Sequence, residues 1–451
     1  MVRHVVIVGG GIAGLACGVA LTDAGLRVTV VEREKRLGGR ARSWTDPASG
    51  DDIDLGPHVL HSEYRNMLAL LERLGTRDLV SWQPEKLLHF SNGVVLRHRR
   101  LPPPLSLLPD LAMQAGLSPR DLWSNNRPTW DAMRFHEADT PALDSISALD
   151  YLRDAGVTQA MIDWFWAFAC LAVLNVPLER CSAAALLRVH SQLIGHRRIH
   201  FGFPAVALAD LFAPQAAKLI GRVLTGTEVI KTEPGAVVLQ DGSRIAADRV
   251  INTVPPQIEA SPYVSSYLWF DRKLTRERFW AQLGAETRLN TDFYDLSNIR
   301  RGWAARPSVI ASNIIYSHRA HTLTNEEIVA ATQREIATFL PEAARARVVH
   351  AVVNRIPMVI PCPLPGSESA RPAPSVSRAG DWTRTGLPCS MESAVCSGFM
   401  VAEEVLQTRG IALPVRPADG LAGLVQKLRS RSAARAPTGR TLPTARPSPR
   451  P

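Results

Sequence analysis

The segment that decides the fold is Val5-Val6-Ile7-Val8-Gly9-Gly10-Gly11-Ile12-Ala13-Gly14, followed shortly afterwards by Val28-Thr29-Val30-Val31-Glu32. The two apolar runs predict buried strands, and the small residues that lead to Gly25 predict a helix between them. A strand, a glycine turn, a helix and a second strand form a βαβ unit. The Gly-x-Gly-x-x-Gly spacing inside this unit is typical of a turn that binds a dinucleotide.

Each glycine of the turn has a physical role. Gly9 permits a tight exit from the first strand, Gly11 leaves room for a pyrophosphate, and Gly14 lets the helix lie close to the sheet. The helix opens at Ile12 and Ala13, where free N–H groups and the positive end of the helix dipole favour phosphate.

An acidic residue, Glu32, ends the second strand eighteen residues after Gly14. Its carboxylate is placed to accept a hydrogen bond from an adenosine ribose hydroxyl. An unrelated buried βα unit can also contain a glycine-rich turn, but such a unit has no need of an acid here. The acid therefore favours a dinucleotide site.

The composition is that of a globular protein, with 451 residues of which 46% are hydrophobic and 21% charged. This length suits two or three lobes. The apolar start has no small-residue cleavage site, and no stretch approaches the ~20 apolar residues of a membrane span. The cysteines show no CxxC pair or metal-ligand spacing, so we expect reduced thiols, a cytoplasmic protein and no metal site. They are Cys17, Cys170, Cys181, Cys362, Cys389 and Cys396.

The net charge of +10 owes much to the last 25 residues. Seven basic residues and no acidic residue lie between Lys427 and the end, which leaves about +3 for the remainder (10 minus 7). The same stretch is rich in Pro, Ser, Ala and Thr, so we expect residues 411–451 to be a disordered basic tail. Such a tail can contact anionic lipid or nucleic acid. We prefer a solvated extension and expect no nucleic-acid partner.

The chain predicts an α/β fold, α+β overall, with a discontinuous Rossmann-like nucleotide domain and an inserted substrate domain of mixed sheet and helices. Strand-like runs return between residues 227 and 254, and Gly380-Asp381 precedes a helix expected over residues 391–407. We infer that these late segments join the first βαβ unit. The nucleotide domain is expected to comprise residues 1–75, 205–262 and 376–410, and the substrate domain residues 76–204 and 263–375.

Further elements are expected inside these segments. Helices are predicted over residues 64–74, 145–195 and 325–339, a hairpin around Asn92-Gly93, and a strand over residues 263–270. Aromatic residues of the middle helical region can form core or line an apolar substrate tunnel. The candidates for such a tunnel are Trp164, Trp166, Phe168 and Trp269.

Residues 97–114 combine a basic run, three prolines and several leucines. One interpretation is a loop and amphipathic helix that contact the inner face of a membrane peripherally. The other is a core helix with a proline-rich entry. The sequence leaves both open.

Several motifs together resemble the FAD-dependent amine oxidase and phytoene desaturase superfamily over residues 4–407. Besides the glycine turn and Glu32-Arg33, these are Gly38-Gly39-Arg40-Ala41, Gly56-Pro57-His58 and Gly380-Asp381-Trp382-Thr383. Within the superfamily, residues 267–274 are similar to the plant-type carotenoid desaturases. Residues 174–177 and 181–183 are similar to the hydroxysqualene dehydroxylases, which are also called squalene-associated desaturases.

The resemblance implies a role for each matched position. Arg40 would neutralise the pyrophosphate, Val229 would present its backbone to the adenine, and Asp381 would accept from the ribityl chain. The helix that starts at Met391 would direct its dipole at the flavin N1 and O2 atoms. The positions expected to bind the cofactor are Gly9, Gly11, Ile12, Ala13, Gly14, Glu32, Arg33, Gly39, Arg40, Gly56, Pro57, His58, Val229, Gly380, Asp381 and Met391.

The implied cofactor is FAD held without a covalent bond. NAD fits the same glycine turn, but a nicotinamide enzyme needs neither the Gly-Gly-Arg element nor the Gly-Asp-Trp-Thr element. Cys389 follows Pro388 and lies outside the context of the cysteine that carries flavin in some amine oxidases. His58 is the one titratable side chain expected near the flavin, as an acid or as a hydrogen-bond partner.

The implied reaction is hydride transfer between the flavin N5 and an apolar isoprenoid substrate. It would desaturate a carotenoid precursor or dehydroxylate hydroxysqualene to squalene. One alternative is an amine oxidase that acts on a small amine. Another, of a different class, is a non-catalytic prenyl-binding escort protein, against which the intact glycine set with Glu32, Arg40 and Asp381 argues.

Overall fold

The computed structural model describes residues 2–197, 199–283 and 288–435. Its first layer is a parallel sheet in the order β10-β2-β1-β14, built from β1 (His4–Val8), β2 (Arg27–Val31), β10 (Arg222–Leu224) and β14 (Arg249–Asn252). Val5 to Val8 pair with Val28 to Val31 on one side and with Arg249 to Asn252 on the other. β1 is therefore a central strand. Val6 packs on one face and Val5 and Ile7 pack on the other, which explains the uninterrupted apolar run.

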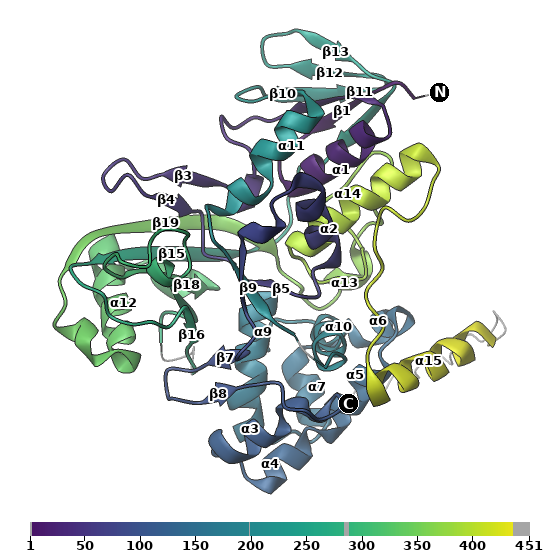
Figure 1. Cartoon of the computed structure of the whole chain (residues 1–451). Coiled ribbons are helices and arrows are strands. Elements are labelled where there is room, and N and C mark those ends of the chain that lie inside the picture. The colour runs from purple at the N-terminus through teal and green to yellow at the C-terminus, as the bar shows by residue number, and fades with distance from the viewer. Residues whose placement is uncertain (1, 198, 284–287, 436–451) are drawn as a thin grey trace, which may run out of the picture.

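A small antiparallel sheet covers one face of the parallel sheet. It consists of β11 (Val229–Glu233), β12 (Ala236–Leu239) and β13 (Arg244–Ala246), and lies at the top of Figure 1. Val237 and Leu239 pack there against Val6 and Val31. Helices α1 (Ile12–Asp23), α2 (Arg65–Leu74), α11 (Ala213–Ile220) and α14 (Met391–Leu406) pack with the sheet's other apolar side chains in a second cluster. The result is a three-layer α/β domain, and the expected fold class is confirmed.

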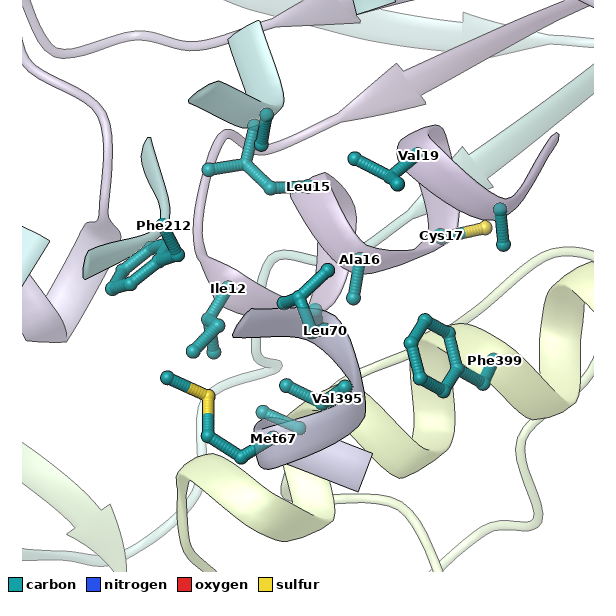
Figure 2. Close-up of a cluster of buried hydrophobic side chains, with 14 of the residues drawn as sticks. Ile12, Leu15, Ala16, Cys17, Val19, Met67, Leu70, Phe212, Val395 and Phe399 are labelled. Carbon is teal, nitrogen blue, oxygen red and sulfur yellow. The ribbon is translucent and has the colours of Figure 1, made fainter. Parts of the chain in front are cut away.

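Helix α1 lies in very close contact with α14, although 379 residues separate their first residues (391 minus 12). A Cβ added at Gly398 would lie 2.4 Å from the Ala13 carbonyl oxygen and 3.1 Å from the Cys17 nitrogen. Figure 2 shows the apolar side chains that surround this crossing, which include Ile12, Leu15, Ala16, Met67, Leu70, Val395 and Phe399. Only glycine permits this approach of the two backbones.

The inserted region contains a five-stranded antiparallel sheet in the order β16-β17-β18-β15-β19. Its strands are β15 (Ala260–Phe270), β16 (Phe279–Ala281), β17 (Asp292–Asp295), β18 (Val309–Ile315) and β19 (Val348–Pro361). Leu268 and Phe270 pack on α12 (Asn325–Phe339), whereas Tyr267 donates its hydroxyl to the Asp54 carbonyl at 2.8 Å. Alternate residues of β15 therefore meet a helix on one face and residues 51–58 on the other.

A helical layer lies below this sheet in Figure 1. Its helices are α3 (Leu108–Gln114), α4 (Pro119–Ser124), α5 (Asn126–Arg134), α6 (Thr140–Leu143), α7 (Ala148–Asp154), α8 (Gln159–Met161), a π-turn (Ile162–Trp166), α9 (Ala167–Leu174) and α10 (Ala183–Ile194). Trp166 is buried in its core, and its Nε1 donates to Asn125 Oδ1 at 2.8 Å. Trp269 is also buried, and its Nε1 donates to Asp51 Oδ2 at 2.7 Å. The other two of the four tunnel candidates, Trp164 and Phe168, are partly buried and pack on Phe90. In the structure all four contribute to packing.

Short strands join the layers. They are β3 (Ser43–Thr45), β4 (Asp52–Asp54), β5 (Leu60–His61), β6 (Val80–Gln83) and β9 (Phe201–Pro204), together with the hairpin of β7 (Leu88–His89) and β8 (Val95–Leu96). The hairpin expected at Asn92-Gly93 and the helices expected at 64–74 and 325–339 are confirmed.

The two interpretations of residues 97–114 each describe part of the segment. On α3, Leu111 is only 8% exposed and packs with Phe90 and Leu96. In contrast, Leu105 is 46% exposed and Met113 is 81% exposed. One side of the segment is core, and the other presents apolar side chains to solvent.

The prediction of a disordered tail over residues 411–451 is wrong for its first part. The Glu403 carboxylate accepts from the N–H groups of Gly410, Ile411 and Ala412 at 2.6–3.1 Å, and residues 420–435 form α15 (Gly420–Arg435). Composition could not reveal this, because the acceptor lies on α14. Residues 436–451 of the expected tail lie outside the described residues.

We predict that Gly398→Val lowers the free energy of unfolding by about 1–3 kcal/mol, because the added side chain must separate α1 from α14. Chemical denaturation monitored by circular dichroism measures the change. Glu404→Val on the exposed side of the same helix is the control and should change stability by less than about 0.5 kcal/mol. Equal stability of the two variants would contradict the packing role of Gly398.

Candidate functional site

The glycine turn has the geometry that its spacing predicts. Gly9 has φ +108°, a conformation that favours glycine. A Cβ at Gly14 would lie 2.2 Å from the Gly9 carbonyl oxygen, so the helix can lie this close to the strand only without a side chain there. Ile12 and Ala13 form the first turn of α1, which has no side-chain cap at Gly11 and no acidic residue. Its free N–H groups are therefore available to an anion.

A second loop lies against the turn. The Gly38 N–H donates to the Gly10 carbonyl at 2.9 Å, and Gly38 and Gly39 have φ values of +105° and +59°. A Cβ at Gly39 would lie 3.2 Å from the Gly11 Cα. The two loops thus form a cradle in which the bare backbones of Gly11 and Gly39 face each other, and a side chain at either glycine would enter the space between them. This shape and the uncapped helix fit the pyrophosphate of a dinucleotide.

The Glu32 carboxylate hydrogen-bonds to the backbone of the glycine turn and of the residues that follow β2. Its Oε2 accepts from the Gly10 N–H at 2.6 Å, and its Oε1 accepts from the Glu34 N–H at 2.8 Å. Each carboxylate oxygen has a further lone pair for a ribose hydroxyl. The Thr227 N–H donates to the Glu32 carbonyl at 3.0 Å, which brings the start of β11 at Val229 close to this acid.

Arg33 is the outlying member of the predicted set. Its side chain is 68% exposed, and its nearest charged partner is Glu34 at 3.5 Å. No described contact joins Arg33 to the glycine turn, so its predicted role stays a prediction.

Arg40 and Asp381 form an ion pair that connects the second loop with the C-terminal segment. Burial lowers the pKa of Arg40, but the Asp381 carboxylate outweighs this effect and raises it above its ordinary value. Both residues were predicted to contact the cofactor, and the structure brings them together from positions 341 residues apart.

Gly380 precedes Asp381 with φ +150° and donates its N–H to Ser397 Oγ at 2.8 Å. Ser397 lies on α14, so this bond holds the Gly-Asp element on that helix. Helix α14 starts at Met391 after Ser390, whose hydroxyl accepts from the Ser393 N–H at 3.2 Å.

The acid in the first turn of α14 is engaged elsewhere. Glu392 accepts from the N–H groups of Asn66 and Met67 at 2.9 and 2.8 Å and thereby caps α2. Burial raises the pKa of its carboxyl above the ordinary value.

Gly56, Pro57 and His58 lie between the nucleotide domain and the five-stranded sheet. A Cβ at Gly56 would lie 2.9 Å from the Tyr263 ring, so glycine is required there. His58 Nδ1 is 2.7 Å from the Gly56 carbonyl oxygen, to which it donates in its Nδ1–H tautomer. Burial lowers the pKa of His58, which favours the neutral imidazole.

Two polar groups behind this segment were not predicted. Arg300 forms an ion pair with Asp54 at 2.6 Å, and both side chains are buried. Asp292 on β17 accepts from Asn313 Nδ2 at 2.7 Å beside Pro57. Local sequence contains no signal for either, because the partners are 246 and 21 residues apart and meet only when the sheet packs on residues 51–58.

Neither a metal site nor a membrane span is found in the described part of the chain. It contains no group of three or more His, Cys, Asp or Glu side chains placed to hold a metal ion. None of its helices is both long enough and apolar enough to cross a bilayer.

The chain matches a known family along most of its length. A model of the flavin-containing amine oxidoreductases matches residues 12–260 and 256–406. This chain belongs to that family. It is therefore a flavin-dependent oxidoreductase, and the predicted superfamily and enzyme class are confirmed.

Several relatives of this chain align with most of its length. The 15-cis-phytoene desaturase of Solanum lycopersicum is 25% identical over 90% of this chain and 78% of its own length. The carotenoid phi-ring synthase of Streptomyces griseus is 27% identical over 94% of this chain and 92% of its own length. The 15-cis-phytoene desaturase of Synechococcus elongatus is 23% identical over 89% and 96%.

Solved structures show the same fold. Wild-type putrescine oxidase bound to putrescine has a TM-score of 0.67 at 18% identity and covers 90% of this chain and 99% of its own. Cyclohexylamine oxidase from Brevibacterium oxydans has a TM-score of 0.63 at 17% identity over 90% and 100%. At such identities the likeness concerns the fold alone.

We predict that Glu32→Ala weakens FAD binding at least about tenfold, because the substitution removes a charged acceptor of the turn and of the ribose. Titration of the apoprotein with FAD, followed by quenching of flavin fluorescence, measures the dissociation constant. Glu34→Ala, an exposed acid two residues away, is the control and should leave the constant within about twofold. A Glu32→Ala constant equal to that of the control would contradict the assignment.

Proposed function

We propose that this flavoenzyme holds FAD without a covalent bond and desaturates an apolar isoprenoid of the carotenoid-precursor class. The observation that carries the substrate proposal is the alignment of about nine tenths of the chain with 15-cis-phytoene desaturases. Dehydroxylation of hydroxysqualene to squalene is the alternative reaction on a substrate of similar chemistry.

Successive groups of residues would hold the successive parts of FAD. Gly9, Gly11, Gly14 and Gly39, with the first turn of α1, would surround the pyrophosphate. Glu32, Arg33 and the backbone at Val229 would hold the adenosine, and Arg40 and Asp381 would meet the phosphates and the ribityl chain. Gly380 supports Asp381, and Gly56 to His58 together with the start of α14 at Met391 would surround the isoalloxazine.

The dipole of α14 supports this placement, because a helix N-terminus stabilises negative charge. A bound flavin supplies a hydride acceptor at N5. The chain's own contribution is to orient the substrate and to keep water out. His58 would contribute a hydrogen bond, since its lowered pKa makes it a poor carrier of positive charge at neutral pH.

Non-covalent binding is supported by the state of Cys389. Burial raises the pKa of its thiol to about 12, and its Sγ donates to the Asp381 carbonyl at 3.3 Å. A thiol becomes a strong nucleophile only as thiolate, so this cysteine is poorly suited to form a flavin bond.

We predict that the purified protein is yellow and that acid precipitation releases all of its FAD into the supernatant. We further expect anaerobic addition of phytoene in liposomes to bleach the flavin and yield a product two mass units lighter, while putrescine leaves the spectrum unchanged. Absorbance at 450 nm and mass spectrometry measure these outcomes. Bleaching by putrescine alone would favour an amine oxidase, conversion of hydroxysqualene to squalene would favour the dehydroxylase, and a colourless protein that ignores FAD would favour an escort protein.

Peripheral attachment to a membrane is a further part of the proposal, because such substrates dissolve in lipid. Leu105, Leu108 and Met113 are exposed on one side of the segment over residues 97–114. Helix α15 starts beside this segment, since a Cβ at Gly420 would lie 3.6 Å from Pro103, and it exposes Leu421, Leu424 and Leu428. Lys427 on the same helix suits an anionic lipid surface.

We predict that the triple variant Leu105→Asp, Leu108→Asp, Met113→Asp lowers the liposome-bound fraction at least about tenfold, because three apolar contacts are replaced by charges. Flotation with anionic liposomes measures binding. Ile230→Asp is the control, since Ile230 is an exposed apolar residue (62%) on the distant strand β11. Leu111 is unsuitable because it belongs to the core. An equal liposome-bound fraction for the triple variant and the wild type would contradict the assignment of this attachment surface.

A further inference from the structure

The face of the five-stranded sheet that meets residues 51–58 carries a buried hydrogen-bonded group. Asp292 of β17 lies opposite Asn313 of β18 in the strand register, and Asn313 Nδ2 donates to Asp292 Oδ1 at 2.7 Å. The Tyr294 hydroxyl also hydrogen-bonds to Asp292, and the Tyr263 hydroxyl of β15 donates to Asn313 Oδ1. One carboxyl, one amide and two phenols therefore form a continuous network across three strands.

The acid of this network, Asp292, is surrounded by neutral polar side chains. Asp292 is 5% exposed, and among the described residues no Lys, Arg or His forms an ion pair with it. Burial raises the pKa of its carboxyl to about 7, and the hydrogen bonds from Tyr294 and Asn313 oppose that rise. The titratable groups that face it are Tyr294 of its own strand and Tyr263 of β15.

A buried acid of this kind is costly for folding. Asp54, by contrast, is buried nearby but is paired with Arg300 at 2.6 Å. An asparagine at position 292 would avoid the desolvation of a charge. Acids whose pKa is perturbed by such surroundings are often found at functional sites.

The network lies next to the segment proposed to surround the flavin. Asn313 Nδ2 is 3.5 Å from the Pro57 carbonyl oxygen, and the Tyr263 ring packs on Gly56. His58 follows directly in the chain, but its lowered pKa leaves it a weak base at neutral pH. Asp292, which Asn313 and Tyr294 hold by hydrogen bonds, is therefore a second acid–base candidate close to this segment.

We propose that Asp292 is the acid–base residue of this enzyme, positioned by Tyr294 and Asn313. This role rests on the proposed desaturase function. In desaturation a bound flavin would supply the hydride acceptor for one allylic carbon. The Asp292 carboxylate would take a proton from the adjacent carbon. The electron pair of that second C–H bond becomes the new C=C bond, and an O–H bond forms on Asp292. The proton would later return to solvent, and the two electrons would leave the substrate with the hydride.

The first test is the pH dependence of flavin reduction by phytoene in stopped-flow absorbance. The wild-type rate should rise with pH and level off above about pH 7, because the ionised carboxylate is the base. Asp292→Asn should lower the rate about 100-fold or more and abolish this dependence. Tyr294→Phe should remain active with a midpoint at higher pH, because loss of its hydrogen bond raises the pKa of Asp292 further.

The control is Asp295→Asn on the same strand. Asp295 accepts from Ser308 Oγ at 2.7 Å and from the Ser297 N–H at 3.0 Å. It lies two residues after Phe293, which packs toward α12. We expect Asp295→Asn to lower stability and to leave the pH midpoint of flavin reduction unchanged. This is the result of losing a buried acid that has only a structural role. Should Asp292→Asn fail to fold, the midpoint shift of Tyr294→Phe still tests the role.

The second test does not depend on activity. The folded-state pKa of Asp292 lies above its unfolded value of 3.8, so the native state binds more protons between these values. Wild-type stability relative to Asp292→Asn should therefore fall as pH rises from about 4 to about 7 and then remain constant. Thermal unfolding of both proteins across this range measures the difference in Tm.

The outcomes distinguish a failure of the Asp292 role from a failure of the desaturase function. A Tm difference that is constant with pH, or an Asp292→Asn reduction rate within about threefold of wild type, overturns the role of Asp292 while leaving the desaturase function intact. A wild-type flavin that no isoprenoid reduces overturns the desaturase function and this role with it, even if the Tm difference changes with pH.

Discussion

The close crossing of α1 and α14 is the contact on which the rest of the structure depends. Gly398 lets the Ala13 carbonyl approach to a distance that no side chain would permit. Because α1 carries the glycine turn and α14 follows the Gly380-Asp381 element, this crossing joins the two ends of the site. Without this crossing, Arg40 and Asp381 would not be held close enough to form their ion pair.

Buried carboxylates then hold the loops around this crossing. Glu392 caps α2, Glu403 binds the chain after α14, and Asp54 pairs with Arg300 of the inserted region. A buried carboxylate needs partners, so each of these acids selects one loop arrangement over others. Buried ion pairs and hydrogen bonds therefore fix the position of the backbone around the candidate site.

The five-stranded sheet separates stability from chemistry by the alternation of its side chains. On β15, Leu268 and Phe270 pack under α12, whereas Tyr263 and Tyr267 face residues 51–58. The apolar face contributes burial, and the other face can hold polar groups because the neighbouring backbone supplies partners. This division explains how an acid such as Asp292 persists inside a sheet.

The sequence by itself determined the βαβ unit, the glycine cradle and the main helices, because these follow from residues close together in the chain. A local pattern predicted Glu32 as a cofactor-binding residue, and the family resemblance predicted Arg40 and Asp381. The contacts of all three became visible only in the folded chain. Only the tertiary structure decided that Leu111 is core while Met113 is exposed, that residues 420–435 are helical, and that Asp292 and Arg300 lie behind Gly56. The physical reason is that burial, ion pairing and acid strength depend on partners distant in sequence, which local patterns do not record.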